Sequence, residues 1–336
     1  MTAELRHEVA PVPTQRVPRL SIGLPVYNGE PFLTEALDAL LAQTFQDFEL
    51  VISDNASTDS TEAICREYAR RDPRIRYVRQ AVNIGSAANH SAVITMSRGE
   101  FFKWASDDDL YAPELLERCI KVLDDNPDVV LAHAWDAFID ETGATIEVVP
   151  YRLETADPRA WVRLRSLLLV SGGNDIYGVI RSTLLAREGF HGSHHNADRT
   201  LVAKLALAGP FQQVPEVLYF RRDHPGRTER RADGPRSRAA ILDPRRANRW
   251  RHPIVRLYAE YIWAYISAVM HAPLGIGEKL RCYREIALWS FGRLRSDGSE
   301  RLLENSPDPA VQARARQTIE AKSHPRFGWR RRGDVS

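Results

Sequence analysis

The stretch Phe101-Phe102-Lys103-Trp104-Ala105-Ser106-Asp107-Asp108-Asp109 sets the first constraint on the fold. Its aromatic first half has the character of a buried strand, and its second half places three carboxylates next to one another. Neighbouring carboxylates repel one another at neutral pH unless a positive group neutralises them. Acids at a strand end suit Mg²⁺ or Mn²⁺, which proteins bind through one or two carboxylates together with phosphate oxygens. We therefore predict a metal and diphosphate site at the end of this strand.

Helix capping is a simpler explanation of the same acids. Asp109 would cap a helix that opens near Pro113, and Glu114 would lie in its first turn, where acids interact favourably with the helix dipole. Capping explains one or two acids but not three directly after a strand. Metal binding is therefore the favoured interpretation.

Upstream of the acids, short apolar runs alternate with amphipathic segments. The predicted strands are Leu20–Pro25, Phe48–Ser53, Arg74–Val78 and Glu100–Trp104. The predicted helices between them are Glu30–Gln43, Thr58–Arg71 with Ser57 or Thr58 as its cap, and Ser86–Ser97. This alternation indicates an α/β fold with a Rossmann-like, mostly parallel sheet flanked by helices. Ligands of such sheets bind outside the carboxyl ends of the strands. The polar residues at those ends are Tyr27, Asn28, Asp54, Asn55 and the acids of 107–109.

Downstream, the pattern is less regular. The predicted elements are a helix from Pro113 to Asn126, a strand at Val129–Trp135, a helix at Pro158–Val170, a strand at Ile176–Arg181, a helix at Ala197–Ala208 and a strand at Val214–Phe220. The chain then divides into a disordered tail at 1–18, an α/β domain at 19–225, a basic mobile loop at 226–253 and a helical C-terminal extension at 254–336.

Composition excludes some classes of protein. The chain has 336 residues, of which 43% are hydrophobic and 27% charged, as in a soluble globular protein. A net charge of +2 does not indicate a nucleic-acid partner. Three widely spaced cysteines fit a reducing cytoplasm better than a disulfide or metal framework. The N-terminus lacks the apolar core of a signal peptide.

The C-terminal part is strongly basic. Between Arg221 and Arg256 there are twelve arginines against four acids, with several prolines and glycines. Ile254–Met270 is an apolar helical pattern that charged residues interrupt, so it is too short for a membrane span. We expect it to pack on the main domain, and peripheral contact with the inner face of a membrane stays open for this C-terminal segment.

Three motifs occur in order at suitable spacing: Ser21–Gly29, Ile52–Asp59, and Ala105–Asp109 with Pro113. Over about residues 19–225 the sequence resembles the family 2 glycosyltransferases of the GT-A fold. The resemblance implies an inverting transfer of a sugar from a nucleoside diphosphate sugar to an acceptor hydroxyl, assisted by Mn²⁺ or Mg²⁺. It assigns nucleotide-sugar binding to the motif residues Pro25, Tyr27, Asn28, Asp54, Asn55 and Asp107.

Individual roles follow from the same resemblance. Tyr27 would stack on the donor base, and Asp54 would hydrogen-bond the base. Asp107 would face the ribose or the diphosphate. Asp108 would hold the metal as part of a DXD motif, and Asp109 would support the following helix.

Two later segments complete the expected site. The helix that starts at Ala197 resembles the family's Glu-Asp pair with alanine in place of the glutamate, which leaves Asp198 as the candidate catalytic base. Arg221-Arg222-Asp223-His224 resembles a late strand that brings basic groups to the diphosphate. Arg221 and Arg222 are therefore expected at the donor, and His224 at the metal. The preceding histidines, His191, His194 and His195, lack the ligand spacing of a structural zinc site, and contact with the acceptor stays open for them.

Two other functions remain as alternatives. A nucleotidyltransferase would have a glycine-rich phosphate loop with a basic residue after the first strand, but Pro25–Gly29 has one glycine and no base. The arginine-rich segment could instead bind nucleic acid or another anionic surface, although the whole chain is nearly neutral. The expected acceptor is a sugar, a lipid-linked molecule or a small molecule, in glycan, glycolipid or natural-product assembly. The sequence identifies neither the sugar nor the oligomeric state.

Overall fold

The computed structural model describes residues 16–149, 151, 153–169, 174–188, 192–194, 196–227 and 235–295. The predicted disordered tail up to residue 15, the end of the chain from residue 296, His191 and His195 lie outside the described residues.

The strands of the described residues form one nine-stranded sheet in the order β3-β2-β1-β4-β8-β6-β9-β5, with β7 paired to β6. The strands are β1 Leu20–Val26, β2 Phe48–Asp54, β3 Ile75–Arg79, β4 Phe101–Trp104, β5 Leu110–Tyr111, β6 Leu131–Ile139, β7 Thr145–Val149, β8 Val179–Arg181 and β9 Phe211–Arg222. The parallel sheet expected from the N-terminal alternation is confirmed, because β1 pairs in parallel with β2 and β4, and β2 with β3.

The other half of the sheet is mixed. β8 runs antiparallel to β4 and β6, β5 runs antiparallel to β9, and only β9 continues the parallel direction beside β6. The predicted sheet is therefore parallel through β3, β2, β1 and β4 and mixed in this half. β5 follows β4 directly, without the crossover that a parallel connection requires, and β8 lies between β4 and β6 and runs opposite to both.

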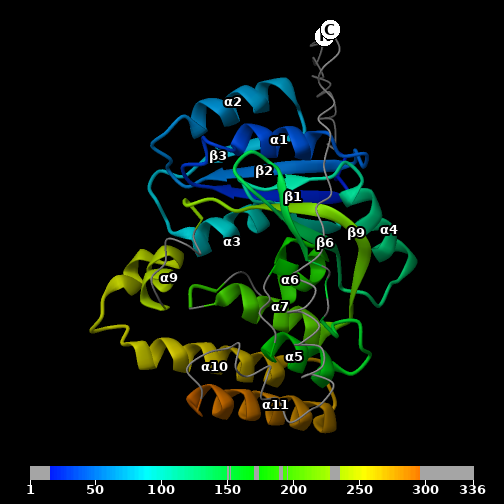
Figure 1. The fold of residues 1–336 in the computed structure, drawn as a ribbon, viewed down its shortest axis with the longest axis vertical. Helices are drawn as coiled ribbons and strands as arrows, with labels where there is room; N and C mark the ends of the chain where they lie inside the picture. The colour runs from blue at the N-terminus through cyan, green and yellow to red at the C-terminus, as the bar shows by residue number, and fades with distance from the viewer. Residues whose placement is uncertain are drawn as a thin grey trace, which may run out of the picture.

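Helices cover both faces of the sheet (Figure 1). They are α1 Leu33–Leu41, α2 Thr61–Arg71, α3 Ser86–Met96, α4 Leu115–Asp125, α5 Ala160–Leu169, α6 Ser182–Glu188, α7 Ala197–Ala208, α9 Pro235–Leu242, α10 Ile254–His271 and α11 Ile276–Arg295, with short 3₁₀ turns η1 Asn174–Tyr177 and η2 Pro244–Ala247. Side chains alternate along β1, so Leu20, Ile22 and Leu24 pack in one apolar core with α1 and α4. On the opposite face, α3 and α7 pack on Phe102 and Trp104 of β4.

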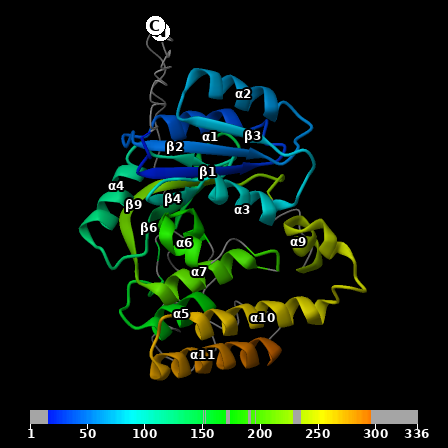
Figure 2. The same cartoon turned by 180° about the vertical axis from the view of Figure 1, so that it is seen from behind.

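A further helical layer lies beyond α7. Residues of α5, α7, α10 and α11 share a separate apolar core that includes Tyr261, Tyr265 and Trp289. Figures 1 and 2 show α10 and α11 at the end of the molecule opposite α2 and β3. The expectation that Ile254–Met270 packs on the main domain is confirmed by its contacts with α7.

Two local predictions are wrong. α2 begins at Thr61 rather than Thr58, and its start is organised by Asp59, whose carboxylate accepts a hydrogen bond from the Thr61 backbone N–H at 3.1 Å. The basic segment expected to be a loop contains α9 and η2. Pro235 stands at the first helical position, where its missing N–H has no cost, and alanines follow it.

Candidate active site

The acidic turn, residues 106–109, joins β4 to β5 at the carboxyl end of β4. The Ala105 N–H donates to Gly23 O at 2.8 Å and extends the pairing of β4 with β1. The Ser106 N–H then donates to the Tyr111 hydroxyl at 2.8 Å. The turn is therefore tied to the strands on both sides of it.

Asp109 faces the protein interior. It is 3% exposed, and its carboxylate accepts hydrogen bonds from the Tyr219 hydroxyl and, at 2.9 Å, from the Arg222 backbone N–H. Burial raises the pKa of Asp109 to about 6, and the charge of Asp108 adds to that rise. The expectation that Asp109 supports the following helix is wrong, because it fastens the acidic turn to β9 instead.

Asp108 faces His224. The Asp108 carboxylate Oδ2 lies 3.0 Å from His224 Nε2, and both side chains are only partly exposed. The structure thus brings together the two metal ligands that were expected from segments far apart in sequence. An oxygen and an imidazole nitrogen are both donors that Mn²⁺ accepts, and two ligands bound at about 2.1 Å to one octahedral ion are about 3.0 Å apart.

The pair alone does not form a closed cage. Among the described residues, no group of three or more His, Cys, Asp or Glu side chains is arranged to hold a metal. A site with few protein ligands is the arrangement in which Mg²⁺ keeps waters and substrate phosphate oxygens. The Asp108–His224 pair therefore fits a cation that arrives with a diphosphate better than a structural metal.

Arg222 supports the acidic turn from the protein interior. Its side chain is 0% exposed, and its guanidinium donates to Asp108 O at 2.9 Å, to Glu141 O at 2.7 Å and to the Glu35 carboxylate at 2.8 Å. These bonds hold the Arg222 guanidinium against the backbone of the acidic turn and of Glu141. The sequence had instead predicted direct contact between Arg222 and the nucleotide sugar. Arg221, also buried, lies 3.4 Å from Asp136.

The loop after β1 approaches the acidic turn closely. A Cβ atom on Gly29 would collide with the Asp107 carboxylate and with Val26, so only glycine permits this approach. Removal from water and the charge of Asp108 raise the pKa of Asp107 well above its ordinary value. Tyr27, in the same loop, is 47% exposed, as a platform for a base would be.

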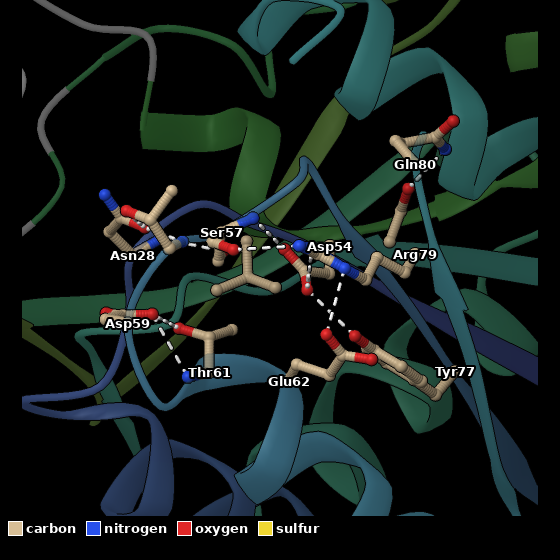
Figure 3. Close-up of polar contacts among 12 residues, drawn as sticks. Asn28, Asp54, Ser57, Asp59, Thr61, Glu62, Tyr77, Arg79 and Gln80 are labelled. Carbon is tan, nitrogen blue, oxygen red and sulfur yellow. Dashed lines mark hydrogen bonds and ion pairs between the residues drawn. The ribbon is translucent and has the colours of Figure 1, made fainter. Parts of the chain in front are cut away.

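Hydrogen bonds join this loop to the loop after β2 (Figure 3). Asn28 has a positive φ of 55°, which asparagine tolerates better than most residues. Its N–H donates to the Ser57 hydroxyl at 2.9 Å, and its side-chain oxygen accepts from the Thr58 N–H at 2.8 Å. The Gly29 N–H donates to the Thr61 hydroxyl at 2.9 Å. The two loops therefore form one surface.

Asp54 and Asn55 lie beneath that surface. Asp54 is 0% exposed and accepts from the Ser57 N–H and the Tyr77 hydroxyl, each at 2.8 Å, with Arg79 at 3.4 Å (Figure 3). The Asn55 side chain accepts from the Ile84 N–H at 2.8 Å and orders the loop before α3. In this arrangement both residues shape the loops around Tyr27. Pro25 lies in β1, opposite Ser53.

Asp198 lies in the first turn of α7 and is partly exposed. The residue before the helix, Asn196, has a positive φ of 53° and makes no side-chain cap bond. His194 Nε2 lies 2.9 Å from the Thr200 hydroxyl, which places this histidine beside the same turn. The described part of the loop thus brings a carboxylate and an imidazole to the start of one helix.

The basic segment contacts the loop before α3 and the loop before α7. A Cβ on Gly85, which has a φ of 87°, would lie 2.7 Å from Leu242 O and 2.8 Å from Pro244 Cδ. Farther along, Arg246 donates to the Ser193 hydroxyl at 3.2 Å and pairs with Glu260. α9 and η2 therefore connect the loop before α3 with the loop before α7.

Several supporting residues were not expected from the sequence. Tyr219 and Glu35 act through partners that only the folded chain brings near. Asp59 differs from them, because the spacing Asp59-x-Thr61 is a local turn signal that could have been recognised. For Tyr219 no comparable signal exists, because its partner lies 110 positions earlier.

Comparisons with known proteins give a consistent result. Residues 21–169 match the family model described as Glycosyl transferase family 2. An uncharacterized glycosyltransferase of Rickettsia typhi is 34% identical over 156 residues, which are 45% of this chain and 48% of that protein. Chondroitin synthase of Escherichia coli is 26% identical over 225 residues, which are 62% of this chain and 29% of that protein. The chain therefore spans about half of these relatives or less.

Solved structures share the fold. Residues 1–349 of TarS from S. aureus, crystallised with UDP, match with a TM-score of 0.60 at 16% identity, over 90% of this chain and 80% of that one. The same fragment with UDP-GlcNAc matches with a TM-score of 0.60 at 18% identity, over 90% and 81% of the two chains. This likeness confirms the GT-A architecture expected from the sequence.

Proposed function

We propose that this chain, whose residues 21–169 match the model of glycosyl transferase family 2, is a member of that family and transfers a sugar from a nucleoside diphosphate sugar to an acceptor hydroxyl with inversion. The observation that carries the proposal is the 3.0 Å approach of His224 to Asp108 in the acidic turn, whose Asp107 lies against Gly29 of the loop after β1. The family match also favours sugar transfer over nucleotidyl transfer and over nucleic-acid binding.

The loops after β1 and β2 would hold the nucleotide. Tyr27 presents an exposed ring on which a base can stack, and stacking of this kind contributes about 1–3 kcal/mol. Asn28 and Asp54 would keep that ring in place through the bonds that join the two loops. TarS was crystallised with UDP and UDP-GlcNAc, so uridine diphosphate sugars are the first donors to test.

The acidic turn would bind the diphosphate. Asp108 and His224 would hold a Mn²⁺ or Mg²⁺ ion, which when bound supplies positive charge against the leaving diphosphate. Arg222 and Asp109 would fix the position of this turn without touching the donor, because both are buried. A turn fixed before the donor arrives needs no rearrangement during the reaction.

Asp198 would accept the proton of the attacking hydroxyl. It is the carboxylate in the first turn of α7, and a positioned carboxylate is a suitable general base. The acceptor would be a sugar, a lipid-linked molecule or a small molecule, in glycan, glycolipid or natural-product assembly.

A donor screen tests the proposal. The protein is incubated with a panel of nucleotide sugars and Mn²⁺, and release of the nucleoside diphosphate is measured with and without candidate acceptors. We expect turnover that falls by about 10³-fold in Asp108→Asn, because several kcal/mol of charge stabilisation are lost. Asp125→Asn, which removes an exposed acid on α4, is the matched control and should keep the parent rate. Equal turnover in both variants would rule out the proposed role of Asp108.

A further inference from the structure

The outer helical layer has two different faces. Its inner face is buried against α5 and α7 through Tyr261, Tyr265, Ile286 and Trp289. Figures 1 and 2 both show α11 as the last layer at this end of the molecule. The residues of α10 and α11 that lie outside this core make up the outer face of the layer.

That outer face is apolar. Of the sixteen exposed large hydrophobic side chains among the described residues, ten lie between Trp250 and Phe291. On α10 they include Val255 at 80%, Trp263 at 59% and Met270 at 45% exposure. On α11 they are Ile276 at 80%, Leu280 at 63%, Leu288 at 59% and Phe291 at 66%. Their clustering distinguishes them from the single exposed apolar residues that are normal on protein surfaces.

The spacing shows that these residues form stripes. Val255, Ala259, Trp263 and Met270 lie four or seven positions apart, which places them along one side of α10. Ile276, Leu280, Ala287 and Phe291 do the same on α11. Each helix therefore has one stripe that faces the core and another that faces outward.

The same region is cationic. Residues 244–292 contain eight arginines and lysines against three acids. All three acids, Glu260, Glu278 and Glu285, are paired with arginines of this region. Arg249 and Arg251, beside the 83% exposed Trp250, extend the positive charge past the start of α10.

We propose that the outer face of α10 and α11, together with Trp250, lies flat on an anionic lipid surface. Exposed tryptophan and aliphatic side chains flanked by arginine are the composition of helices that rest in the interfacial region of a bilayer. None of the described helices is long and apolar enough to cross a membrane, so the contact is peripheral. A second copy of the chain is a poorer occupant, because its own positive face would oppose this one. This inference is independent of the proposed sugar transfer.

Sedimentation with vesicles tests the proposal. The full chain is mixed with vesicles of phosphatidylcholine alone or of phosphatidylcholine with phosphatidylglycerol. We expect binding to the anionic vesicles that weakens with salt and little binding to the neutral ones. Trp263→Glu and Phe291→Glu should each weaken binding by about tenfold, since each removes one large side chain from the bilayer. Arg249→Glu should weaken binding to the anionic vesicles by at least about fivefold.

Ile146→Glu is the matched control. Ile146 is 56% exposed but lies on β7, a strand paired with β6 in the sheet, so binding should stay unchanged. Nucleoside diphosphate release measured without vesicles should be equal in all these variants, which separates this proposal from the catalytic one. Binding to both vesicle types that no variant alters would overturn the proposal. The proposal would also be overturned if the protein did not bind vesicles and instead formed a dimer, seen by ultracentrifugation, that Trp263→Glu dissociates. The outer face of α10 and α11 would then contact a second copy of the chain.

Discussion

The acidic turn and the start of α7 are held in different ways. Asp109 in the acidic turn is bonded to Tyr219 and Arg222, which lie 110 and 113 positions later in the chain. At the start of α7, the hydrogen bonds of Thr200 to Asn196, Ala197 and His194 span at most six positions. The acidic turn is therefore fixed only when β9 has joined the sheet, whereas the α7 turn is organised mainly by its own helix. The acidic turn should therefore be sensitive to changes in its distant partners on β9. The start of α7 should be sensitive to a change in the carboxylate of Asp198.

The largest effect is expected from Asp198→Asn. The amide keeps the size and the helix-start preference of the acid but accepts no proton, so kcat should fall by about 10²–10⁴-fold with an unchanged donor Kd. Glu216→Gln, an exposed acid on β9, serves as control. A near-parent kcat would show that Asp198 is only part of the helix start. The search for the base would then turn to Asp175, which is 4% exposed, and to the loop 191–195.

Arg222→Met tests the long-range contacts that hold the acidic turn. It leaves the carbonyls of Asp108 and Glu141 without their donor, and the free energy of unfolding should fall by about 3 kcal/mol. Arg222→Lys should recover part of that loss, because an ammonium cannot reproduce the planar fork. Urea unfolding measures both variants. Arg118→Met, which removes an exposed pair at 3.6 Å, should change stability by less than about 0.5 kcal/mol. An Arg222→Met variant as stable as this control would show that the buried bonds do not support the turn.

The pH dependence of stability at Lys103 tests the packing in the same region. Lys103 is buried beside the rings of Tyr111 and Tyr219, at 5.2 and 5.3 Å, and burial lowers its pKa from 10.5 to about 8. Between these two values the unfolded chain binds the proton and the folded chain does not, so stability should rise with pH. Relative to Lys103→Met, the wild-type free energy of unfolding should gain about 2 kcal/mol between pH 8 and pH 10. A difference that is constant with pH would contradict this burial of Lys103.

The smallest expected effect is that of Tyr27→Ala. Loss of a stacking platform remote from the reacting carbon should raise the donor KM by about tenfold and leave kcat unchanged. Asp54→Ala should also raise KM, and in addition it should lower stability, because Asp54 is buried with three donors. Tyr258→Ala removes a tyrosine of similar exposure on α10 and should leave donor kinetics unchanged. A fall in kcat alone for Tyr27→Ala would remove this residue from the donor site.

The sequence predicted well the parts of the structure that depend on local pattern. The bounds of α7, the strands β1 and β2, and the places of Tyr27, Asn28 and Asp108 follow from periodicity and from the rule that parallel strands present their carboxyl ends together. Asp108 and His224 were expected at one metal through resemblance, and the structure places them in contact.

What the sequence could not supply depends on long-range pairing. The role of Asp109 and the burial of Arg222 both follow from β9 lying antiparallel to β5, and no local signal encodes that pairing. α9 was missed because the arginines, prolines and glycines of the basic segment around it outweighed the Ala239-Ala240 pair, although Ala239 is fully buried in the folded chain. Tertiary contact overrides weak local preference at such positions.

The central claim is that Asp108 and His224 together hold a divalent cation against the donor's diphosphate. Calorimetric titration of nucleoside diphosphates, with and without Mn²⁺, measures this directly in the wild type and in Asp108→Asn. The account predicts that Mn²⁺ tightens nucleotide binding by at least about tenfold in the wild type, and that Asp108→Asn loses this gain while keeping the metal-free affinity. A full Mn²⁺-dependent gain in Asp108→Asn would contradict the account.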